Sequence, residues 1–320
     1  MVNLLRLLKL LFFRRRPKGQ VDISKIKLPE RVKVPNAIGN SSPKGGIGKT
    51  TIQLESGVQL ILRGRNVVFI DWDIMSPRLS LRLLRELKSG PSLVKVLIGM
   101  MDVTEAVQEA VITGKRGSVT VHVVPAVTEE DIPDNINRLL EEMNEPSKVV
   151  KIVTKMKGSV EKLAKEYDVV FNDYPVPSWA TYYTYQHLLS TTSSWINLLS
   201  DSNPNMIQLI AQLHQRYTKN IPVLGTIINM VRPTPEELNR AKDYATELCK
   251  EVSGRVAMAI PFDGKLYDVF AEGLASPASL NYPPESSPAL MLIKRFVDVL
   301  EEVAEGRSPP ESCQVLSPMF

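Results

Sequence analysis

The segment of residues 44–51, Lys-Gly-Gly-Ile-Gly-Lys-Thr-Thr, constrains the fold of this chain more than any other feature of its sequence. Its three glycines allow backbone N–H groups to point inward, and the Lys49 ammonium and the Thr50 hydroxyl follow directly. These are the groups that hold a polyphosphate and its Mg²⁺ ion. Such a loop needs a strand before it and a helix after it, and residues 34–41 and 50–62 suit these two elements.

Short apolar runs alternate with longer segments of helical period from about residue 34 onward. The expected strands are residues 34–41, 67–71, 119–125, 169–173, 195–199, 222–229 and 255–260. The expected helices are residues 50–62, 147–166, 205–217, 235–252 and 289–305. Strands that alternate with helices indicate βαβ units. We therefore predict an α/β fold with a single doubly wound, mostly parallel sheet and helices on both faces.

The chain ends differ in composition from this central region. Residues 1–16 place leucines at helical spacing beside basic residues, which predicts an amphipathic helix able to lie on a membrane surface. A linker over residues 17–33, a main domain over residues 34–306 and a flexible tail over residues 307–320 complete the expected organisation.

Charge is unevenly distributed along the chain. The formal net charge is +4, and residues 1–18 carry six basic residues and no acid. The rest of the chain holds 33 basic against 35 acidic residues, so it is close to neutral. A broad DNA-binding face is therefore not expected on the main domain, and the basic N-terminus favours an anionic membrane instead.

The remaining composition argues for a cytoplasmic protein. Cys249 and Cys313 form neither a CxxC clamp nor a four-thiolate metal site, and they do not suggest a disulfide framework. No apolar run approaches the roughly 20 residues that a membrane-spanning helix needs. The histidines, His122, His187 and His214, lie in no catalytic or metal-binding motif. We expect a reducing compartment, with attachment at the inner face of the cell membrane.

Three acidic residues stand at the ends of two predicted buried strands. Asp71 and Asp73 follow the strand of residues 67–71, and Asp173 ends that of residues 169–173. Residues two apart in a strand face the same side, and ligand sites of such sheets lie at the carboxyl ends of the strands. The three carboxylates are therefore expected to converge with the glycine-rich loop on one Mg²⁺-bound triphosphate. Trp72, between the first two, is expected to be a packing residue.

The segment 44–51 resembles the deviant Walker A motif of the MinD/ParA group of ATPases, KGGxGKT[TS]. This resemblance implies that Lys44 reaches across a nucleotide-sandwich dimer to the phosphates of the partner subunit. It also implies that Lys49 contacts the β- and γ-phosphates, Thr50 binds Mg²⁺ and Thr51 contacts the α-phosphate. The loop backbone at Gly45, Gly46, Ile47 and Gly48 would surround the phosphates.

Further segments resemble the other motifs of this group. Residues 67–77 resemble switch I, which implies that Asp73 orients the attacking water and Asp71 supports the Mg²⁺ shell. Residues 167–175 resemble the Walker B and switch II segment, in which Asp173 binds Mg²⁺ through water. Residues 221–230 and 260–263 resemble the base pocket, with Asn229 reading adenine and Pro261 and Phe262 closing the pocket.

The implied function is a dimerising ATPase switch with ATP and Mg²⁺ as cofactors. We expect a homodimer in the ATP state, an activating protein partner, and a role in positioning, partitioning or assembling a larger structure. Two departures from the motifs, Pro43 and the glycine-free segment 175–178, favour an alternative, a nucleotide-gated membrane adaptor with little hydrolysis. Further alternatives are a ParA-like DNA partition ATPase and, from the loop of residues 73–77, an Mrp-like carrier.

Overall fold

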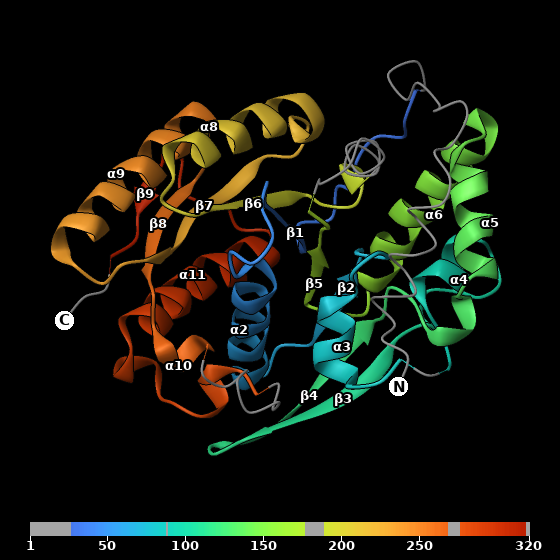
Figure 1. Cartoon of the computed structure of the whole chain (residues 1–320), viewed down its shortest axis with the longest axis horizontal. Coiled ribbons are helices and arrows are strands. Elements are labelled where there is room, and N and C mark those ends of the chain that lie inside the picture. Colours follow the sequence, from blue (N-terminus) through green and yellow to red (C-terminus); the bar gives the residue numbers. More distant parts are fainter. Residues whose placement is uncertain (1–26, 88, 177–188, 268–275, 318–320) are drawn as a thin grey trace.

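The computed structural model describes residues 27–87, 89–176, 189–267 and 276–317, which form one extended sheet between helices (Figure 1). The predicted amphipathic helix of residues 1–16 lies outside the described residues. The strands are β1 (Ala37–Ser41), β2 (Val67–Asp71), β3 (Gln108–Gly114), β4 (Gly117–Val124), β5 (Val169–Asp173), β6 (Trp195–Ser200), β7 (Val223–Val231), β8 (Val256–Pro261) and β9 (Gln314–Val315). Their order in the sheet is β3-β4-β2-β5-β1-β6-β7-β8-β9. Only the pairing of β3 with β4 is antiparallel among the described strands.

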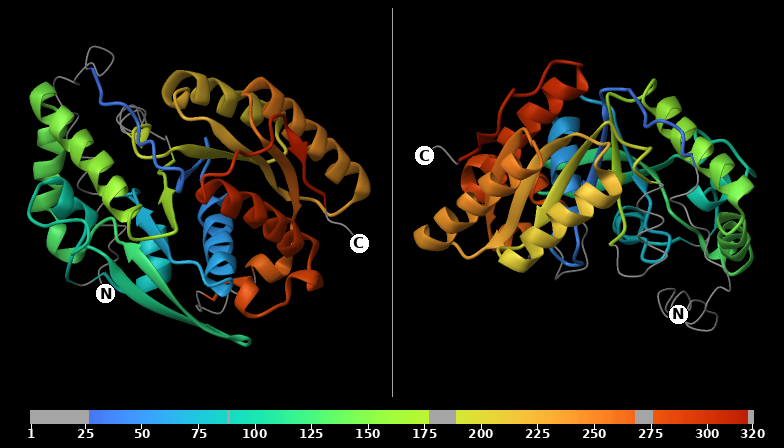
Figure 2. Two further views of the ribbon diagram at one scale, coloured as in Figure 1. Left: turned by 180° about the vertical axis from the view of Figure 1, so that it is seen from behind. Right: turned by 90° about the horizontal axis from the view of Figure 1, so that it is seen from above.

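Helices cover both faces of the sheet, as Figure 2 shows from behind and from above. They are α2 (Lys49–Leu62), α3 (Arg78–Leu84), α4 (Leu93–Leu97), α5 (Asp134–Met143), α6 (Pro146–Leu163), α8 (Pro204–Leu213), α9 (Pro235–Glu251), α10 (Gly264–Tyr267) and α11 (Pro288–Ala304). Side chains of α2, α3 and α11 share one apolar core, and side chains of α4, α5, α6 and α8 share the other. The predicted doubly wound, mostly parallel sheet is confirmed.

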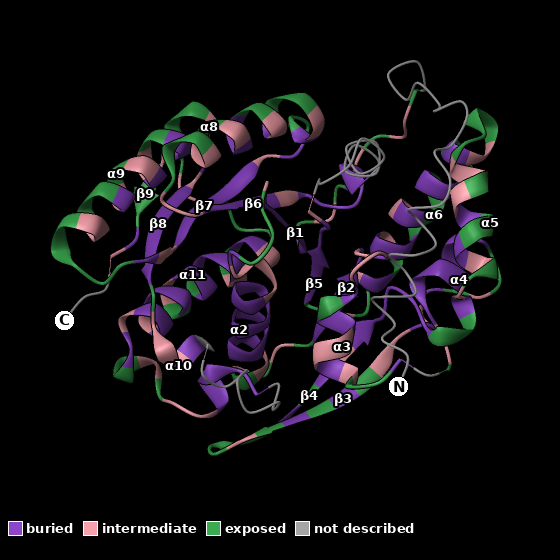
Figure 3. Cartoon of the chain, in the orientation of Figure 1, coloured by how far each residue is buried: buried purple, intermediate pink, exposed green. Residues whose placement is uncertain are grey.

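The residues of β2 show how the sequence builds this two-sided core. Val67 and Phe69 belong to the core beneath α2, whereas Val68 and Ile70 belong to the core beneath α6. All of β2 is buried, because helices cover it on both faces (Figure 3). A Cβ atom on Gly57 of α2 would lie 2.2 Å from the ring of Phe69. Glycine at this position thus lets the helix after the loop approach the sheet closely.

The hairpin of β3 and β4 was only half predicted. The sequence indicated a strand near β4, but β3 was missed because its residues alternate between buried Ala110 and Ile112 and exposed Glu109 and Val111. This period-2 pattern is short and contains few large apolar side chains, so no continuous apolar run marks it. The hairpin forms one edge of the sheet (Figure 1).

The prediction of a flexible tail over residues 307–320 was wrong for its described part. Residues Gln314 and Val315 form β9, which pairs with the first residues of β8, and the Leu316 side chain is buried in the α2 core. A strand of two residues has too little pattern to be detected in a sequence rich in serine and proline. Residues 314–315 of the tail are therefore part of the sheet.

The prediction that the cysteines stay unpaired was also wrong. Cys249 at the end of α9 and Cys313 beside β9 form a disulfide, although they are 64 residues apart in the sequence. Their Cα atoms lie 6.1 Å apart because β9 returns the chain to the β8 edge that α9 covers. Only the tertiary fold creates this proximity. Disulfides are rare in a reducing compartment, so this bond disagrees with the compartment that we expected. Intracellular proteins of hyperthermophiles nevertheless commonly contain disulfides.

His214 is a buried histidine at the end of α8, in agreement with its absence from any motif. Its Nδ1 lies 2.9 Å from the Thr218 hydroxyl, and burial lowers its pKa to about 4. The unfolded chain therefore binds more protons than the folded chain between about pH 6.5 and pH 4. The free energy of unfolding is expected to fall by up to about 3 kcal/mol as the pH falls through this window. Urea unfolding of the protein and of His214→Phe at several pH values measures this, and an equal loss in both would contradict it.

None of the helices in the described residues is both long enough and apolar enough to cross a membrane.

Candidate functional site

The glycine-rich loop lies between the carboxyl end of β1 and the start of α2. Gly46 and Gly48 have φ values of 79° and 84°, in the left-handed region that favours glycine. A Cβ atom on Gly46 would meet no atom within 4 Å, and the residue is exposed. The Ser42 hydroxyl accepts a hydrogen bond from the Lys44 N–H at 3.1 Å, which fixes the turn around Pro43. The loop is thus an open turn in which Gly46 borders free space.

The first two residues of α2 meet the end of β5. The Lys49 ammonium donates to one oxygen of Asp173 at 3.2 Å, and the Thr50 hydroxyl donates to its other oxygen at 2.8 Å. The Lys49 and Asp173 side chains are only 10% and 4% exposed, so this ion pair is largely withdrawn from water. The structure thus brings these three residues together.

Asp71 lies beside Asp173, because the two are partners in the register of β2 and β5. One of its carboxylate oxygens accepts hydrogen bonds from the N–H and the hydroxyl of Ser80, at 2.9 and 2.7 Å. The other oxygen accepts the Asp73 N–H at 3.0 Å. Asp71 is fully buried and already hydrogen-bonded to its own chain. It therefore fixes the start of α3 and supports the loop after β2.

Asp73 lies on that loop, where its carboxylate accepts the Ser76 N–H at 2.9 Å. Burial raises its pKa to about 6, and the neighbouring Lys49 ammonium opposes this rise. Burial also raises the pKa of Asp71, and the charge of Asp173 adds to the effect. Three carboxylates therefore lie close enough to repel one another around one lysine. A cation placed among them would relieve this repulsion.

Lys44 and Thr51 contact residues that the sequence did not single out. The Lys44 ammonium forms an ion pair with Asp201, after β6, at 3.0 Å, and its side chain is 56% exposed. The Thr51 hydroxyl accepts a hydrogen bond from Arg82 of α3 at 3.2 Å. Neither Asp201 nor Arg82 lies in a motif, so only the fold reveals these contacts.

The predicted base-pocket residues lie at the ends of β7 and β8. Asn229 is buried, and its side-chain amide donates to the Ile47 carbonyl of the loop at 2.7 Å. This donor holds the loop in the structure, and an adenine amino group, itself a donor, would be read by the Asn229 side-chain oxygen instead. Pro261 ends β8, and Phe262 is 51% exposed beside it. The structure thus brings Asn229 to the loop and leaves the Phe262 ring accessible at the adjacent strand end.

The residues present fit a Mg²⁺-bound nucleotide. Among the described residues, no group of three or more histidine, cysteine and acidic side chains could hold a metal ion by itself. The site instead offers the Thr50 hydroxyl, the Asp173 carboxylate and a loop of exposed glycines. Mg²⁺ commonly takes one or two protein ligands and completes its shell with water and phosphate oxygens. The donor set therefore suits Mg²⁺ that arrives with a polyphosphate.

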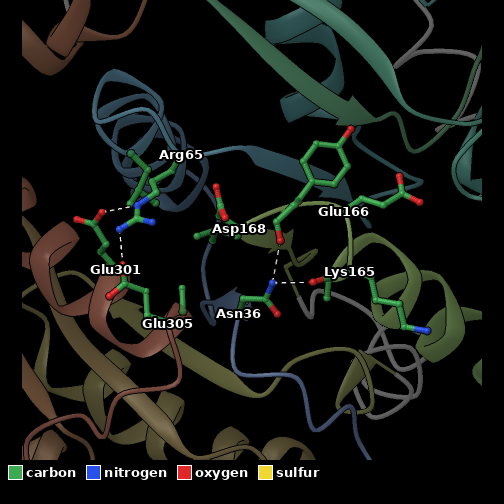
Figure 4. A pocket seen from close by; sticks show the side chains of 12 residues that line it. Asn36, Arg65, Lys165, Glu166, Asp168, Glu301 and Glu305 are labelled. Carbon is green, nitrogen blue, oxygen red and sulfur yellow. Dashed lines mark hydrogen bonds and ion pairs between the residues drawn. The ribbon is translucent and has the colours of Figure 1, made fainter.

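A cavity of about 280 Å³ lies at the opposite, amino-terminal edge of the central strands (Figure 4). Asn36 donates to the Ala164 and Tyr167 carbonyl groups there, and Arg65 bonds the Glu301 and Glu305 carboxylates. Main-chain carbonyls thus satisfy the Asn36 amide and two carboxylates satisfy the Arg65 guanidinium, as the dashed lines in Figure 4 show. None of the residues of the glycine-rich loop lines this cavity.

Comparisons with known proteins agree with this geometry. A model of the CobQ/CobB/MinD/ParA nucleotide-binding domain matches residues 38–276, well over half of the chain. No curated protein sequence matches the chain.

Several solved structures share the fold. The Pyrococcus horikoshii septum site-determining protein MinD, in complex with Mg-ADP, is 23% identical, with a TM-score of 0.54 over 84% of this chain and 94% of that one. Cyanothece McdA is 16% identical, with a TM-score of 0.59 over 82% and 98% of the two chains. Mycobacterium smegmatis cobyrinic acid a,c-diamide synthase, with ADP and magnesium, is 18% identical, with a TM-score of 0.57 over 88% and 98%.

The glycine-rich loop, its lysine and threonine, and the strand-end carboxylates all fall within the matched residues. The chain therefore belongs to the CobQ/CobB/MinD/ParA family of nucleotide-binding domains and has the fold of a MinD/ParA-type P-loop ATPase.

Proposed function

We propose that this protein is an ATP-dependent switch that binds MgATP, dimerises, and returns to the monomer after hydrolysis. The observation that carries the proposal is the contact of Lys49 and Thr50 with the two oxygens of Asp173. Mg²⁺ would bind Thr50 directly and Asp173 through water, and Lys49 would turn to the β- and γ-phosphates. The ion supplies charge neutralisation for phosphoryl transfer to water.

The other two carboxylates, of Asp73 and Asp71, would have different roles. Asp73 stands on a loop and would hold the attacking water with its ionised carboxylate. Asp71 would act through its hydrogen bonds, because Ser80 and the Asp73 N–H occupy both of its oxygens. Its support for the Mg²⁺ shell would therefore consist in positioning Asp73. Thr51 would contact the α-phosphate after leaving Arg82.

Dimerisation would use Lys44, which lies on the exposed side of the loop. To reach the phosphates of a partner subunit, its ammonium must first leave Asp201. Size measurement by light scattering with ATP, with ADP, and for Lys44→Ala tests the switch. An ATP-dependent dimer that Lys44→Ala abolishes supports it, and an unchanged size in all samples would remove the dimer from the proposal.

The variant Asp201→Asn is expected to strengthen the ATP-dependent dimer. An exposed ion pair contributes about 0.2–1 kcal/mol, so its removal should lower the dimer dissociation constant by up to about fivefold. Light scattering across a protein dilution series measures this constant. Glu86→Gln, a similar charge change in the turn after α3, serves as control, and a weakened dimer in Asp201→Asn alone would contradict a competing role for Asp201.

The cellular role that we propose is positioning, partitioning or assembly of a larger structure at a membrane. Residues 1–16 would bind an anionic membrane at its inner face from the cytoplasm, and a protein partner would stimulate hydrolysis. The structure of Aquifex aeolicus MinD in complex with MinC, which shares the fold, is consistent with a switch that acts on a protein partner. DNA remains a less favoured partner, because the main domain is nearly neutral.

One observation favours the alternative of a nucleotide-gated adaptor. Residues 175–178 after Asp173, Pro-Val-Pro-Ser, contain no glycine, and two prolines restrict the backbone at this switch. Phosphate release at steady state, with and without anionic vesicles, separates the two functions. ATP binding and dimerisation without turnover, and with no effect of Asp73→Ala, would favour the adaptor.

A further inference from the structure

A buried polar cluster lies directly behind the three carboxylates. We define it by Trp72, Asn172, Tyr174, Thr192 and Ser193, all of which are fully buried. Trp72 stands between Asp71 and Asp73, and Asn172 and Tyr174 stand on either side of Asp173. Because neighbouring strand residues face opposite sides, the cluster and the carboxylates occupy the two faces of the same strand ends. Trp72 and Tyr174 accordingly belong to the core on the α6 face.

Hydrogen bonds connect every member of this cluster. The Trp72 indole N–H donates to the Asn172 side-chain oxygen at 2.8 Å. The Asn172 amide donates to the Ser193 hydroxyl and the Thr192 carbonyl, each at 3.0 Å. The Tyr174 hydroxyl lies 2.8 and 2.7 Å from the hydroxyls of Thr192 and Ser193. Burial of five polar side chains is costly without partners, so the cluster specifies one arrangement.

The cluster joins the ends of β2 and β5 and packs against β1. Trp72 is joined to β5 twice, through its indole and through its backbone N–H, which donates to the Asp173 carbonyl at 3.1 Å. On β1, a Cβ atom on Gly39 would lie 2.7 Å from the Ser193 hydroxyl and 2.9 Å from the Tyr174 ring. The cluster thus packs against the strand that leads into the glycine-rich loop.

Because of these contacts, the position of Trp72 affects the position of the next residue, Asp73. Asp73 follows Trp72 directly, and Asp173 follows Asn172 directly. The indole–amide hydrogen bond therefore ties the residue before Asp73 to the residue before Asp173. A change in the spacing of the two carboxylates must strain or break this bond, whose donor and acceptor side chains are fully buried.

We propose that Trp72 and Asn172 are positioning residues that set the spacing between the Asp73 and Asp173 carboxylates for Mg²⁺ and for the attacking water. This rests on the proposed function, since it names residues that serve the same nucleotide site. A role in packing alone predicts a loss of stability without any effect specific to Mg²⁺ or turnover. The two roles therefore give different measurements.

The test uses Trp72→Phe, which keeps an aromatic ring in the core but removes the N–H donor. Leaving the buried Asn172 oxygen without its donor should lower kcat for ATP about tenfold and change KM less than about threefold. Asn172→Leu breaks the same bond from the other side, together with the hydrogen bonds to Ser193 and Thr192, and should lose at least as much. If Trp72 acts through this bond, the double variant loses no more than Asn172→Leu alone. Trp195→Phe on β6 is the matched control and should retain full turnover.

A binding measurement keeps this test separate from the proposed function. ATP affinity is measured by calorimetry with Mg²⁺ and with EDTA, for the wild-type chain and for both single variants. In the variants, the gain in ATP affinity that Mg²⁺ gives should be about tenfold smaller than in the wild type. Their ATP affinity in EDTA should be unchanged. Absence of turnover in the wild-type chain would overturn the ATPase function but leave this measurement decisive. A Mg²⁺-dependent gain and a kcat equal to those of the wild type in folded Trp72→Phe and Asn172→Leu would overturn the positioning role.

Discussion

Replacement of Lys49 by alanine is expected to lower ATP turnover by about 10²–10³-fold, as is typical when a preorganised charge at a transition state is removed. The structure indicates why the effect should be large. Lys49 is the cation that lies among Asp73 and Asp173, and its side chain is only 10% exposed. Without it, two carboxylates and the incoming triphosphate repel one another, so nucleotide binding should weaken as well as turnover.

The measurement combines phosphate release with calorimetric binding of MgATP, and Lys44→Ala is its matched control. Both substitutions remove one lysine from the same loop, yet Lys44 is largely exposed and pairs with Asp201. Lys44→Ala should therefore retain MgATP binding to the single chain and lose the dimer, whereas Lys49→Ala should lose binding itself. Equal affinity in Lys49→Ala and in the wild type would contradict the assignment of this loop as the phosphate site.

The variant Asp173→Asn removes the negative charge at this position but keeps a hydrogen-bond partner for Thr50. An amide retains a partner for the Thr50 hydroxyl but cannot neutralise Lys49 or attract Mg²⁺. Nucleotide without metal should bind this variant at least as well as the wild type, because one negative charge is gone. The Mg²⁺-dependent gain should disappear, which distinguishes a metal role of Asp173 from a purely structural one.

Two central strands, β2 and β5, could be predicted from the sequence to the residue. Residues 67–71 and 169–173 each begin with a run of apolar residues and end in an acid, and the structure places the two strands at these bounds. A strand buried on both faces requires such a run, so the pattern and the fold agree. The meeting of Asp71, Asp73 and Asp173 with the loop followed from the parallel arrangement alone, because parallel strands end at one edge of the sheet.

The contacts that motif residues make with residues outside the motifs could not be predicted. Asp201, Arg82 and Ser80 each touch a motif residue from a segment without a motif of its own, and such contacts depend on helix placement. Trp72 was expected to pack in the core and does so, but its hydrogen bond to Asn172 joins two strands 100 residues apart. Sequence periodicity reports which face a residue takes, not which partner it meets there.

The second large effect concerns the C-terminal strap, which we define as residues 307–317. Besides the disulfide and β9, the strap is held by Arg255, which donates to the Pro310 and Glu311 carbonyls, and by Arg295, which donates to the Ser317 carbonyl. These contacts should remain partly formed without the disulfide. They are local, however, and do not restrict the unfolded chain, whereas the disulfide closes a loop of 64 residues.

Reduction of the Cys249–Cys313 disulfide is therefore expected to lower the free energy of unfolding by about 4 kcal/mol, the loop-closure value for this separation. Urea unfolding with and without a dithiol measures this loss. Cys313→Ser should show the same loss without the dithiol and no further change with it. The serine is placed at Cys313, not at Cys249, because Cys249 is fully buried and packs against Gly254, so its replacement would also disturb the core.

The same reduction should leave MgATP affinity unchanged. β9 pairs with Val256 and Ala257 at the amino end of β8, whereas the base-pocket residues stand at its carboxyl end. Amide hydrogen exchange should show lost protection at Gln314 and Leu316, whose N–H groups donate to the β8 edge, and retained protection in β1 and β5. Unchanged unfolding in the presence of the dithiol would show that the local contacts alone hold the strap. A loss of nucleotide affinity would instead show that the β8 edge and the site are coupled through the length of the strand.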